Sequence, residues 1–318
     1  MRGYVIRRLL ALLPTLLLAS IIVFVTVRLI PGDVIDLMLS QNDVSADRRN
    51  RDQLIAALGF DVPMWQQYGC WVSSIVLQGD LGKSLWRGTP VTEMLLARLP
   101  VTFELGAIAL VVGLLIALPI GIYSAVRQDT RGDYLARSFS ILLLAVPSFW
   151  LGTMVVVFPS IWWGWSPPIG YTSFTQSPLQ NLQQMLLPGI VLGAALSAIT
   201  MRLTRTMMLE VLRQDYIRTA WAKGLSERLV ILRHALRNAM IPVVTLIGLQ
   251  APLLIGGAVI IEQIFVIPGM GLLLLEAVQE RDYPIVTGVF LMVGVAVMLI
   301  NLLVDLSYGL LDPKVRMR

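Results

Sequence analysis

The chain has 318 residues, of which 56% are hydrophobic and 14% are charged, compared with about 25% charged residues in ordinary soluble proteins. One soluble core could not bury that much apolar surface, so the composition excludes an ordinary soluble protein. The net charge of +5 suggests nucleic acid, but the basic residues lie between long uncharged segments, which favours a membrane protein. The single Cys70 excludes an internal disulfide, and the single His234 lacks a second histidine with which to bind a metal.

The first uncharged segment, 9–27, follows three arginines and ends before Arg28. Its length is close to the about 20 residues that span a bilayer, whereas the core of a secretory signal has only about 7–15. The pattern therefore predicts a retained first transmembrane helix.

A polar segment follows at 31–100. It contains a charged stretch at 46–58 that is typical of a helix, and then a second stretch with apolar and aromatic residues on one side: Trp65, Tyr68, Trp71, Val72 and Ile75. Tryptophan and tyrosine are common in helices that lie at a membrane surface. A helix packed inside the protein fits the same pattern, so both interpretations stay open.

The sequence 79–84, GDLGKS, superficially suggests a phosphate-binding loop. Such a loop needs a glycine five positions before its Gly-Lys-Ser, and Leu77 occupies that position. We therefore expect no nucleotide site in this segment. No set of residues for nucleophilic catalysis is evident elsewhere, so the sequence does not indicate an enzyme.

Five further uncharged segments predict membrane helices at about 105–126, 138–160, 185–205, 239–261 and 283–304. The hairpin between the third and fourth helices is marked by tryptophans and prolines. Mid-span prolines such as Pro147 and Pro252 could bend the helices, and small residues such as Gly193 allow close packing. Simple bundle packing without a gating role is the more economical interpretation for each of them.

Acidic residues are expected only at the ends of these helices, at Glu104, Glu262 and Asp305. Charges inside a membrane usually mark proton or ion pathways. Their predicted absence from the middle of the spans disfavours a proton-driven carrier or a channel with a charged filter.

The basic segment from Asp215 to Pro242, which we call the elbow, interrupts the apolar pattern. Its first part predicts a helix with one face formed by Ile217, Ala220, Trp221, Gly224 and Leu225. Gly224 is expected to end this helix, because glycine adopts the left-handed conformation without steric cost. Ser226 would then cap a second helix with Leu229, Leu232, Leu236 and Met240 on one face, and Pro242 would begin a new segment.

The positive-inside rule predicts the orientation. Seventeen Lys and Arg residues lie in 1–8, 125–137, 202–237 and 309–318, compared with seven in the alternate segments. Both termini and the elbow are therefore expected in the cytoplasm.

The run Arg218-Thr219-Ala220-x-x-x-Gly224 resembles the EAA loop of ABC-transporter permeases, although Trp221 stands where that pattern usually has arginine. The stretches 79–85, 98–102 and 311–316 are similar to the B-type permease subunits of the dipeptide and oligopeptide branch. The resemblance implies an all-α polytopic fold with six transmembrane helices: the MetI-like type I importer fold, with an extra N-terminal helix and an outer-face segment.

The resemblance also divides the chain. It implies an N-terminal helix in 1–30, an extracytoplasmic segment in 31–97, an ABC transmembrane domain in 98–310 with a coupling region at 206–238, and a tail in 311–318. The residues expected to contact an ATPase subunit form the coupling loop: Asp215, Tyr216, Arg218, Thr219, Ala220, Trp221, Lys223, Gly224, Leu225, Ser226 and Glu227.

The partners implied are a C-type permease subunit, one or two ABC ATPase subunits that hold ATP and Mg²⁺, a peptide-binding protein outside the cell and the lipid bilayer. No cofactor or metal is expected in this chain, and the location implied is the bacterial cytoplasmic membrane. Relatives of the same architecture import nickel chelates, glutathione or haem, and the sequence does not identify the cargo or the residues of the pathway. An ion-coupled secondary transporter or a channel is the alternative from another class.

Overall fold

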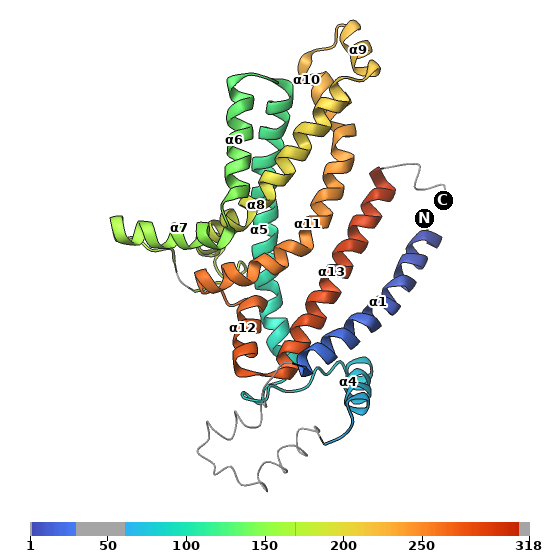
Figure 1. Ribbon diagram of the computed structural model, residues 1–318, viewed down its shortest axis with the longest axis vertical. Helices are drawn as coiled ribbons and strands as arrows, with labels where there is room; N and C mark the ends of the chain where they lie inside the picture. The colour runs from blue at the N-terminus through green and yellow to red at the C-terminus, as the bar shows by residue number, and fades with distance from the viewer. Residues whose placement is uncertain (1, 30–60, 169, 312–318) are drawn as a thin grey trace. The chain divides into compact units, whose positions relative to one another are not determined.

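The computed structural model describes residues 2–29, 61–168 and 170–311, which form helices joined by short loops and contain no β-strand (Figure 1). In chain order the helices are α1 (Arg2–Arg28), α4 (Met64–Gln78), α5 (Val91–Val126), α6 (Arg131–Ala145), α7 (Ser148–Trp163), α8 (Pro178–Leu212), α9 (Asp215–Ala222), α10 (Glu227–Leu229), a π-helix (Val230–Ala235), α11 (Leu236–Phe265), α12 (Met270–Glu280) and α13 (Tyr283–Leu311). The expected all-α class is confirmed for this part of the chain. The helix expected at 46–58 lies outside the described residues.

Five helices in the described ranges are long and apolar enough to cross a membrane, and the number rises to seven if two bent helix pairs are each one span. The first span, Leu10–Arg28, agrees with the helix predicted at 9–27. The predicted number of six lies inside this range and stays a prediction.

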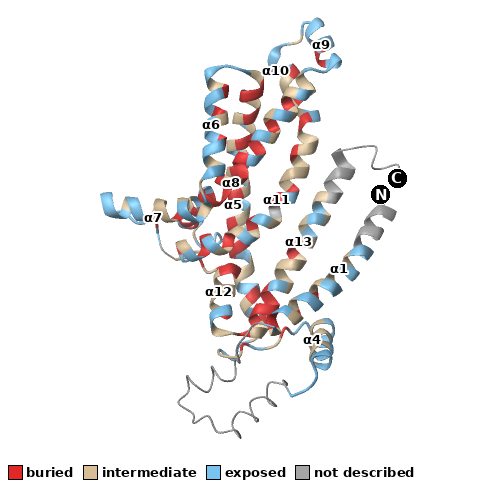
Figure 2. Ribbon diagram, viewed as in Figure 1, coloured by how far each residue is buried: buried red, intermediate tan, exposed pale blue. Residues whose placement is uncertain are grey.

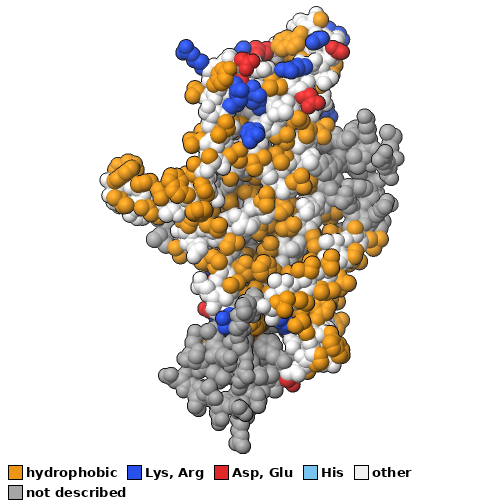
Figure 3. Space-filling view, viewed as in Figure 1, with side chains coloured by type: hydrophobic (Ala, Val, Ile, Leu, Met, Phe, Trp, Pro, Cys, Tyr) orange, Lys and Arg blue, Asp and Glu red, His pale blue; other side chains and the backbone are white. Residues whose placement is uncertain are grey.

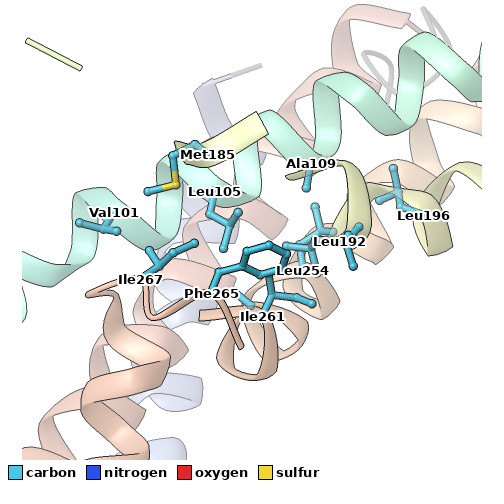
Figure 4. Close-up of a cluster of buried hydrophobic side chains, with 12 residues drawn as sticks. Val101, Leu105, Ala109, Met185, Leu192, Leu196, Leu254, Ile261, Phe265 and Ile267 are labelled. Carbon is cyan, nitrogen blue, oxygen red and sulfur yellow. The ribbon is translucent and has the colours of Figure 1, made fainter. Parts of the chain in front are cut away.

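The chain divides into two compact units. Unit 1 contains 1–5, 100–272 and 297–318, and unit 2 contains 6–99 and 273–296. The core of unit 1 is a cluster of apolar side chains from α5, α8 and α11 (Figure 4). Leu105, Met185 and Ile261 are completely buried there, one from each helix. Apolar side chains from the three helices thus bury one another, and this burial explains why the helices pack together.

Glycines let α5 and α8 approach closely. A Cβ atom on Gly193 of α8 would collide with the carbonyl oxygen of Ala109 on α5, and one on Gly113 would lie 2.5 Å from Leu196 Cδ2. Small residues at such crossings bring two backbones into van der Waals contact. The close packing expected at Gly193 is confirmed.

Two sharp bends interrupt the helices of the membrane region. α6 and α7 meet at 93°, and Pro252–Phe265 meets α12 at 79°. Val146 is extended between α6 and α7, as expected for a residue that precedes a proline. The bend that Pro147 could provide is thus present, and the segment predicted as a helix at 138–160 consists of the two helices α6 and α7. Pro242, by contrast, lies inside α11 and begins no new segment.

Several predicted boundaries are also wrong. The helix expected at 105–126 begins at Val91, and the one expected at 185–205 runs from Pro178 to Leu212. The prediction located the helices by their lack of charge. Charge marks where a helix leaves the bilayer, whereas a helix ends where its backbone hydrogen bonds end.

Glu104 is consequently not at a helix end, since thirteen residues of α5 precede it. Its Oε2 atom accepts a hydrogen bond of 2.8 Å from the hydroxyl of Tyr171, in the loop after α7. Burial and this hydrogen bond raise the pKa of Tyr171 to about 12, so the phenol stays protonated and remains a donor. The acidic side chain thus holds the α7–α8 loop against α5.

Thr102 and Glu262 fasten the second bend. The Thr102 hydroxyl donates to Glu262 Oε1 at 2.6 Å and accepts from the Met270 backbone N–H at 2.8 Å. Glu262 Oε2 also accepts from the Leu272 N–H at 2.9 Å, so the carboxylate lies at the positive end of α12. Gly269 and Gly271 lie so close to this carboxylate that a Cβ atom on either would collide with it. Thr102, in the stretch 98–102, therefore holds the turn between α11 and α12.

Replacing Thr102 with valine is expected to lower the free energy of unfolding by about 2–3 kcal/mol, because two buried hydrogen bonds are lost and one involves a carboxylate. The thermal midpoint of the purified protein in detergent measures this change. Thr245→Val is the matched control, since the Thr245 hydroxyl bonds only the Ile241 carbonyl of its own helix. Equal midpoints for the two variants would show that Thr102 does not hold the turn.

In unit 2, α4 packs against α1 through aromatic side chains. The Phe24 ring lies 5.3 Å from Tyr68 and 5.5 Å from Trp71, and the Tyr68 hydroxyl is hydrogen-bonded to Ser20 Oγ at 2.8 Å. The predicted amphipathic helix is confirmed, and Tyr68 and Trp71 belong to its packed face. Trp65 does not, since it is 71% exposed.

The GDLGKS segment is a structural loop of unit 2. Ser84 Oγ donates to Asp282 Oδ2 at 2.5 Å, and the Leu85 N–H donates to the same oxygen at 3.1 Å. Asp282 is fully buried and also accepts from the Ile285 N–H in the first turn of α13. Ser84, which stands where a phosphate-binding loop has its serine, therefore holds the N-terminus of α13 through Asp282.

Candidate functional site

The coupling loop begins with α9, whose bounds, Asp215–Ala222, agree with the predicted helix. Ile217 and Ala220 are buried in an apolar cluster that includes Met208 of α8 and Val230 and Ala235 of the next helical segment. A helix of eight residues is too short to be stable alone, so this burial holds it in place.

Gly224 forms the turn after α9, with a φ of 73° in the left-handed region. The Gly224 N–H donates to the Trp221 carbonyl at 2.9 Å, and the Leu225 N–H donates to that of Ala220 at 3.4 Å. These bonds satisfy carbonyls that the helix end leaves without partners. The helix stop predicted at Gly224 is confirmed. Ser226 stands at the predicted cap position, but its side chain makes no capping hydrogen bond.

The second half of the elbow differs from the prediction. A π-helical stretch, Val230–Ala235, leads directly into α11. The buried positions are consequently Val230, Ala235 and Ala239, spaced by five and then four residues. The extra residue of a π-turn rotates the helix surface relative to a regular α-helix. The residues predicted to share one face are therefore divided, since Leu229 and Leu232 are exposed whereas Leu236 packs against the buried cluster.

Much of α9 is exposed (Figure 2), and hydrophobic and charged side chains gather at this end of unit 1 (Figure 3). Tyr216 and Trp221 are 43% and 44% exposed, and the side chains of Arg218 and Asp215 are more exposed still. Trp221 was predicted to share a helix face with Ile217 and Ala220, but those two residues are buried whereas Trp221 is not. The Tyr216 hydroxyl accepts a hydrogen bond of 2.8 Å from Asn238 Nδ2, which ties α9 to α11. The coupling loop thus presents exposed side chains on a helix that is tied to α11.

A buried ion pair supports the part of α8 that leads to the coupling loop. Asp133 of α6 is fully buried and accepts hydrogen bonds from Arg205 Nε at 2.9 Å and Arg205 Nη2 at 2.8 Å. Ser124 of α5 donates to the same carboxylate, and so does the Asp129 N–H at 3.0 Å. Three helices are therefore joined at one carboxylate near the start of the coupling loop.

Sequence reasoning missed this ion pair, because Asp133 lies between the segments predicted as membrane helices, 105–126 and 138–160. The available signals were an arginine inside a largely apolar helix and Thr130 three residues before Asp133. Thr130 does cap α6, where its side chain accepts from the Asp133 N–H. The pairing itself connects residues 72 positions apart, and no local pattern indicates it.

Comparison with known proteins identifies the family. Residues 117–317 match the family described as binding-protein-dependent transport system inner membrane component, and residues 1–106 match the N-terminal family of the same transport systems. The chain is a member of this permease family. It is therefore a transport subunit, and a multi-pass protein of the bacterial inner membrane.

Two curated relatives match almost the whole permease. The dipeptide transport system permease protein DppB of Escherichia coli (strain K12) is 40% identical, with 99% of both chains covered. The oligopeptide transport system permease protein AppB of Bacillus subtilis (strain 168) is also 40% identical with the same coverage. The recognised resemblance to the dipeptide and oligopeptide branch is confirmed.

Solved structures of importers show the same fold. An inward-facing structure of the MetNI methionine ABC transporter is similar with a TM-score of 0.56 and 16% identity, covering 69% of this permease and 97% of that chain. An amino acid ABC transporter crystallised with histidines is similar with a TM-score of 0.54 and 13% identity, covering 68% and 92%. The MetI-like type I importer fold expected from the sequence is thus confirmed.

Proposed function

We propose that this permease imports dipeptides or oligopeptides by using ATP hydrolysis in partner ATPase subunits, which the coupling loop contacts. The main support is the exposed surface of α9, held rigidly on a buried base at the end of α8. The transport of peptides is supported by the names of the two full-length relatives, DppB and AppB. The proposed contacts are the eleven coupling-loop residues from Asp215 to Glu227.

The proposed mechanism is a rigid-body displacement. A push on α9 reaches α8 and α11 through the buried side chains of Ile217 and Ala220 and through the Tyr216–Asn238 hydrogen bond. The Asp133–Arg205 pair carries the movement of α8 to α5 and α6. Such a push shifts the transporter between two states only if the ATPase contacts the loop differently in each state.

The partner subunits and the orientation of the permease follow from this proposed function. ATP and Mg²⁺ bind to the ATPase subunits, a C-type permease completes the membrane domain, and a peptide-binding protein delivers cargo to the side opposite the elbow. The proposal places the elbow and both termini in the cytoplasm, the segment 31–97 outside, and the ABC transmembrane domain at 98–310. The distribution of Lys and Arg supports this orientation.

Uptake by proteoliposomes tests the function. Vesicles that hold the permease with its companion permease and ATPase subunits are expected to take up a labelled dipeptide only when ATP is on the elbow side and the binding protein is on the other. Removing the proton and sodium gradients should leave uptake unchanged. Uptake that needs such a gradient and proceeds without ATP would show a secondary transporter instead.

A competition series in the same vesicles tests the cargo. Unlabelled dipeptides or oligopeptides are expected to inhibit uptake, whereas nickel chelates, glutathione and haem should not. If nickel chelates, glutathione or haem inhibit uptake and peptides do not, the ATP-driven mechanism would still hold but the cargo would be that compound and not a peptide.

A further inference from the structure

The helix α4 of unit 2 lies beside the end of α1, the first membrane span (Figure 1). Arg28, the last residue of that span, donates from Nε to Gln67 Oε1 at 2.9 Å. Ser20, earlier in the span, is hydrogen-bonded through Oγ to the Tyr68 hydroxyl at 2.8 Å. Because an α-helix rises about 1.5 Å per residue, these two contacts lie about 12 Å apart along α1. The contacts of α4 thus extend from the end of the span well into it.

The length and composition of α4 suit a helix in the membrane interface. It has 15 residues and none of them is charged, whereas Asp61 and Asp80 flank it. At about 1.5 Å per residue it is about 22 Å long, which is shorter than the hydrocarbon core of about 30 Å, so it does not cross the bilayer. It also contains Trp65, Tyr68 and Trp71, and these two residue types are enriched where a membrane meets water.

Two opposite sides of α4 differ in polarity. An apolar stripe is formed by residues at i, i+4, i+7 and i+11: Trp65, Gly69, Val72 and Val76. A polar stripe runs along the opposite side: Gln67, Ser74 and Gln78. Trp65 and Val76 are 71% and 74% exposed, and a Cβ atom on Gly69 would meet nothing within 4 Å. The part of the chain that the structure describes therefore leaves most of the apolar stripe uncovered.

The contacts with α1 determine the direction in which the apolar stripe faces. Successive helix residues are about 100° apart around the axis, so the polar stripe, the packed face with Tyr68 and the apolar stripe follow one another in that order. The polar stripe meets α1 at Arg28, the end of the span, and the packed face meets it deeper, at Ser20. The apolar stripe is the next surface around α4, so it faces further toward the middle of the span.

We propose that α4 lies in the membrane interface, with the apolar stripe against the acyl chains and the polar stripe toward water. Interfacial helices bury their apolar side about 5–10 Å into the boundary between headgroups and acyl chains. Lipid is the partner that fits, because a stripe level with the interior of a membrane span is level with the acyl chains that surround the span. The orientation proposed above makes this the outer leaflet, so α4 holds the extracytoplasmic segment at the membrane surface beside α1.

Spin labels test this position in the complete transporter, reconstituted into lipid bilayers with cysteine-free companion subunits. Cys70 is the single cysteine of the permease, so Cys70→Ser gives a background for one labelled cysteine at a time. Val76→Cys and Gly69→Cys each place the label on the apolar stripe, and either variant suffices if the other fails to fold. Gln78→Cys is the matched control, because it places the label two residues from Val76 but on the polar stripe.

The measurement is the accessibility of each label to oxygen, which concentrates among acyl chains, and to a water-soluble nickel chelate. The ratio of oxygen to nickel accessibility is expected to be several-fold higher on the apolar stripe than at Gln78→Cys. Higher accessibility to nickel on the apolar stripe would overturn the proposal, because that stripe would then lie in water. Shielding from both reagents would also overturn it, since a protein subunit would then cover the stripe. Equal ratios on the two stripes would do the same, because α4 would then have no defined orientation to the bilayer. None of these outcomes depends on whether the transporter takes up peptides.

Discussion

Replacing Asp133 with alanine is expected to lower the free energy of unfolding by about 3 kcal/mol, which is the low end of the range for breaking a buried ion pair. Asp133 is fully buried, and the variant leaves the guanidinium of Arg205 without its partner in a site where that side chain is only 19% exposed. The Ser124 hydroxyl and the Asp129 N–H also lose their acceptor. Thermal unfolding in detergent measures the change.

Asp129→Asn is the control for this variant. Its side chain is 66% exposed and lies 4.0 Å from Arg137, so its removal is expected to cost less than about 1 kcal/mol. Asparagine also tolerates the φ of 61° at this position. A second substitution, Arg205→Met, should recover part of the loss in Asp133→Ala, because it removes the unpaired charge. Similar midpoints for Asp133→Ala and Asp129→Asn would show that the ion pair does not hold the helices together.

Patterns of neighbouring residues in the sequence correctly predicted those parts of the permease whose structure depends on interactions between neighbouring residues. The bounds of α9 follow from the spacing of Ile217 and Ala220, and its end follows from the one residue type that enters the left-handed region freely. The membrane class and the first span likewise follow from composition and length. The family motif and these patterns agree at the coupling loop, which is why its geometry was predictable.

Other features depend on contacts between distant residues. The start of α5 at Val91 is decided by packing inside unit 2, where Val91 and Leu95 lie against Gly288 of α13. The inward face after Gly224 is decided by one π-turn, which shifts every later position by one residue. Hydrophobic periodicity assumes a regular helix, so it grouped Leu229 and Leu232 with Leu236 on one face, although the first two are exposed and Leu236 packs against the buried cluster.

Sequence patterns were also unable to predict the partners of two charged side chains. Asp133 lies between two predicted membrane helices and Glu104 was placed at a helix end, since isolated charges near an apolar segment are ordinarily solvated. In the structure each has a specific partner from another helix or loop, Arg205 and Tyr171. Both partners are distant in the sequence. A single amino-acid sequence contains no signal that connects them.

Replacing Gly224 with valine is expected to abolish ATP-dependent peptide uptake while the spans still insert. A Cβ atom at this position would meet no atom within 4 Å, so the substitution causes no crowding, but the φ of 73° is strongly unfavourable for a β-branched residue. The cost is about 1–2 kcal/mol, and the turn relieves it by moving toward negative φ, which changes the direction in which α9 leaves the elbow. The ATPase surface would then no longer match the coupling loop.

Gly224→Asn separates backbone geometry from the loss of glycine itself, because asparagine adopts the left-handed region more readily than any other residue with a side chain of this size. Uptake should therefore remain near the original rate in Gly224→Asn and be lost in Gly224→Val, with equal amounts of both variants in the membrane. Copurification of the ATPase subunit shows whether the valine variant is detached, and ATP hydrolysis without uptake shows whether it is uncoupled. Full uptake by Gly224→Val would contradict the rigid-body mechanism, since the direction of α9 would then not matter for transport.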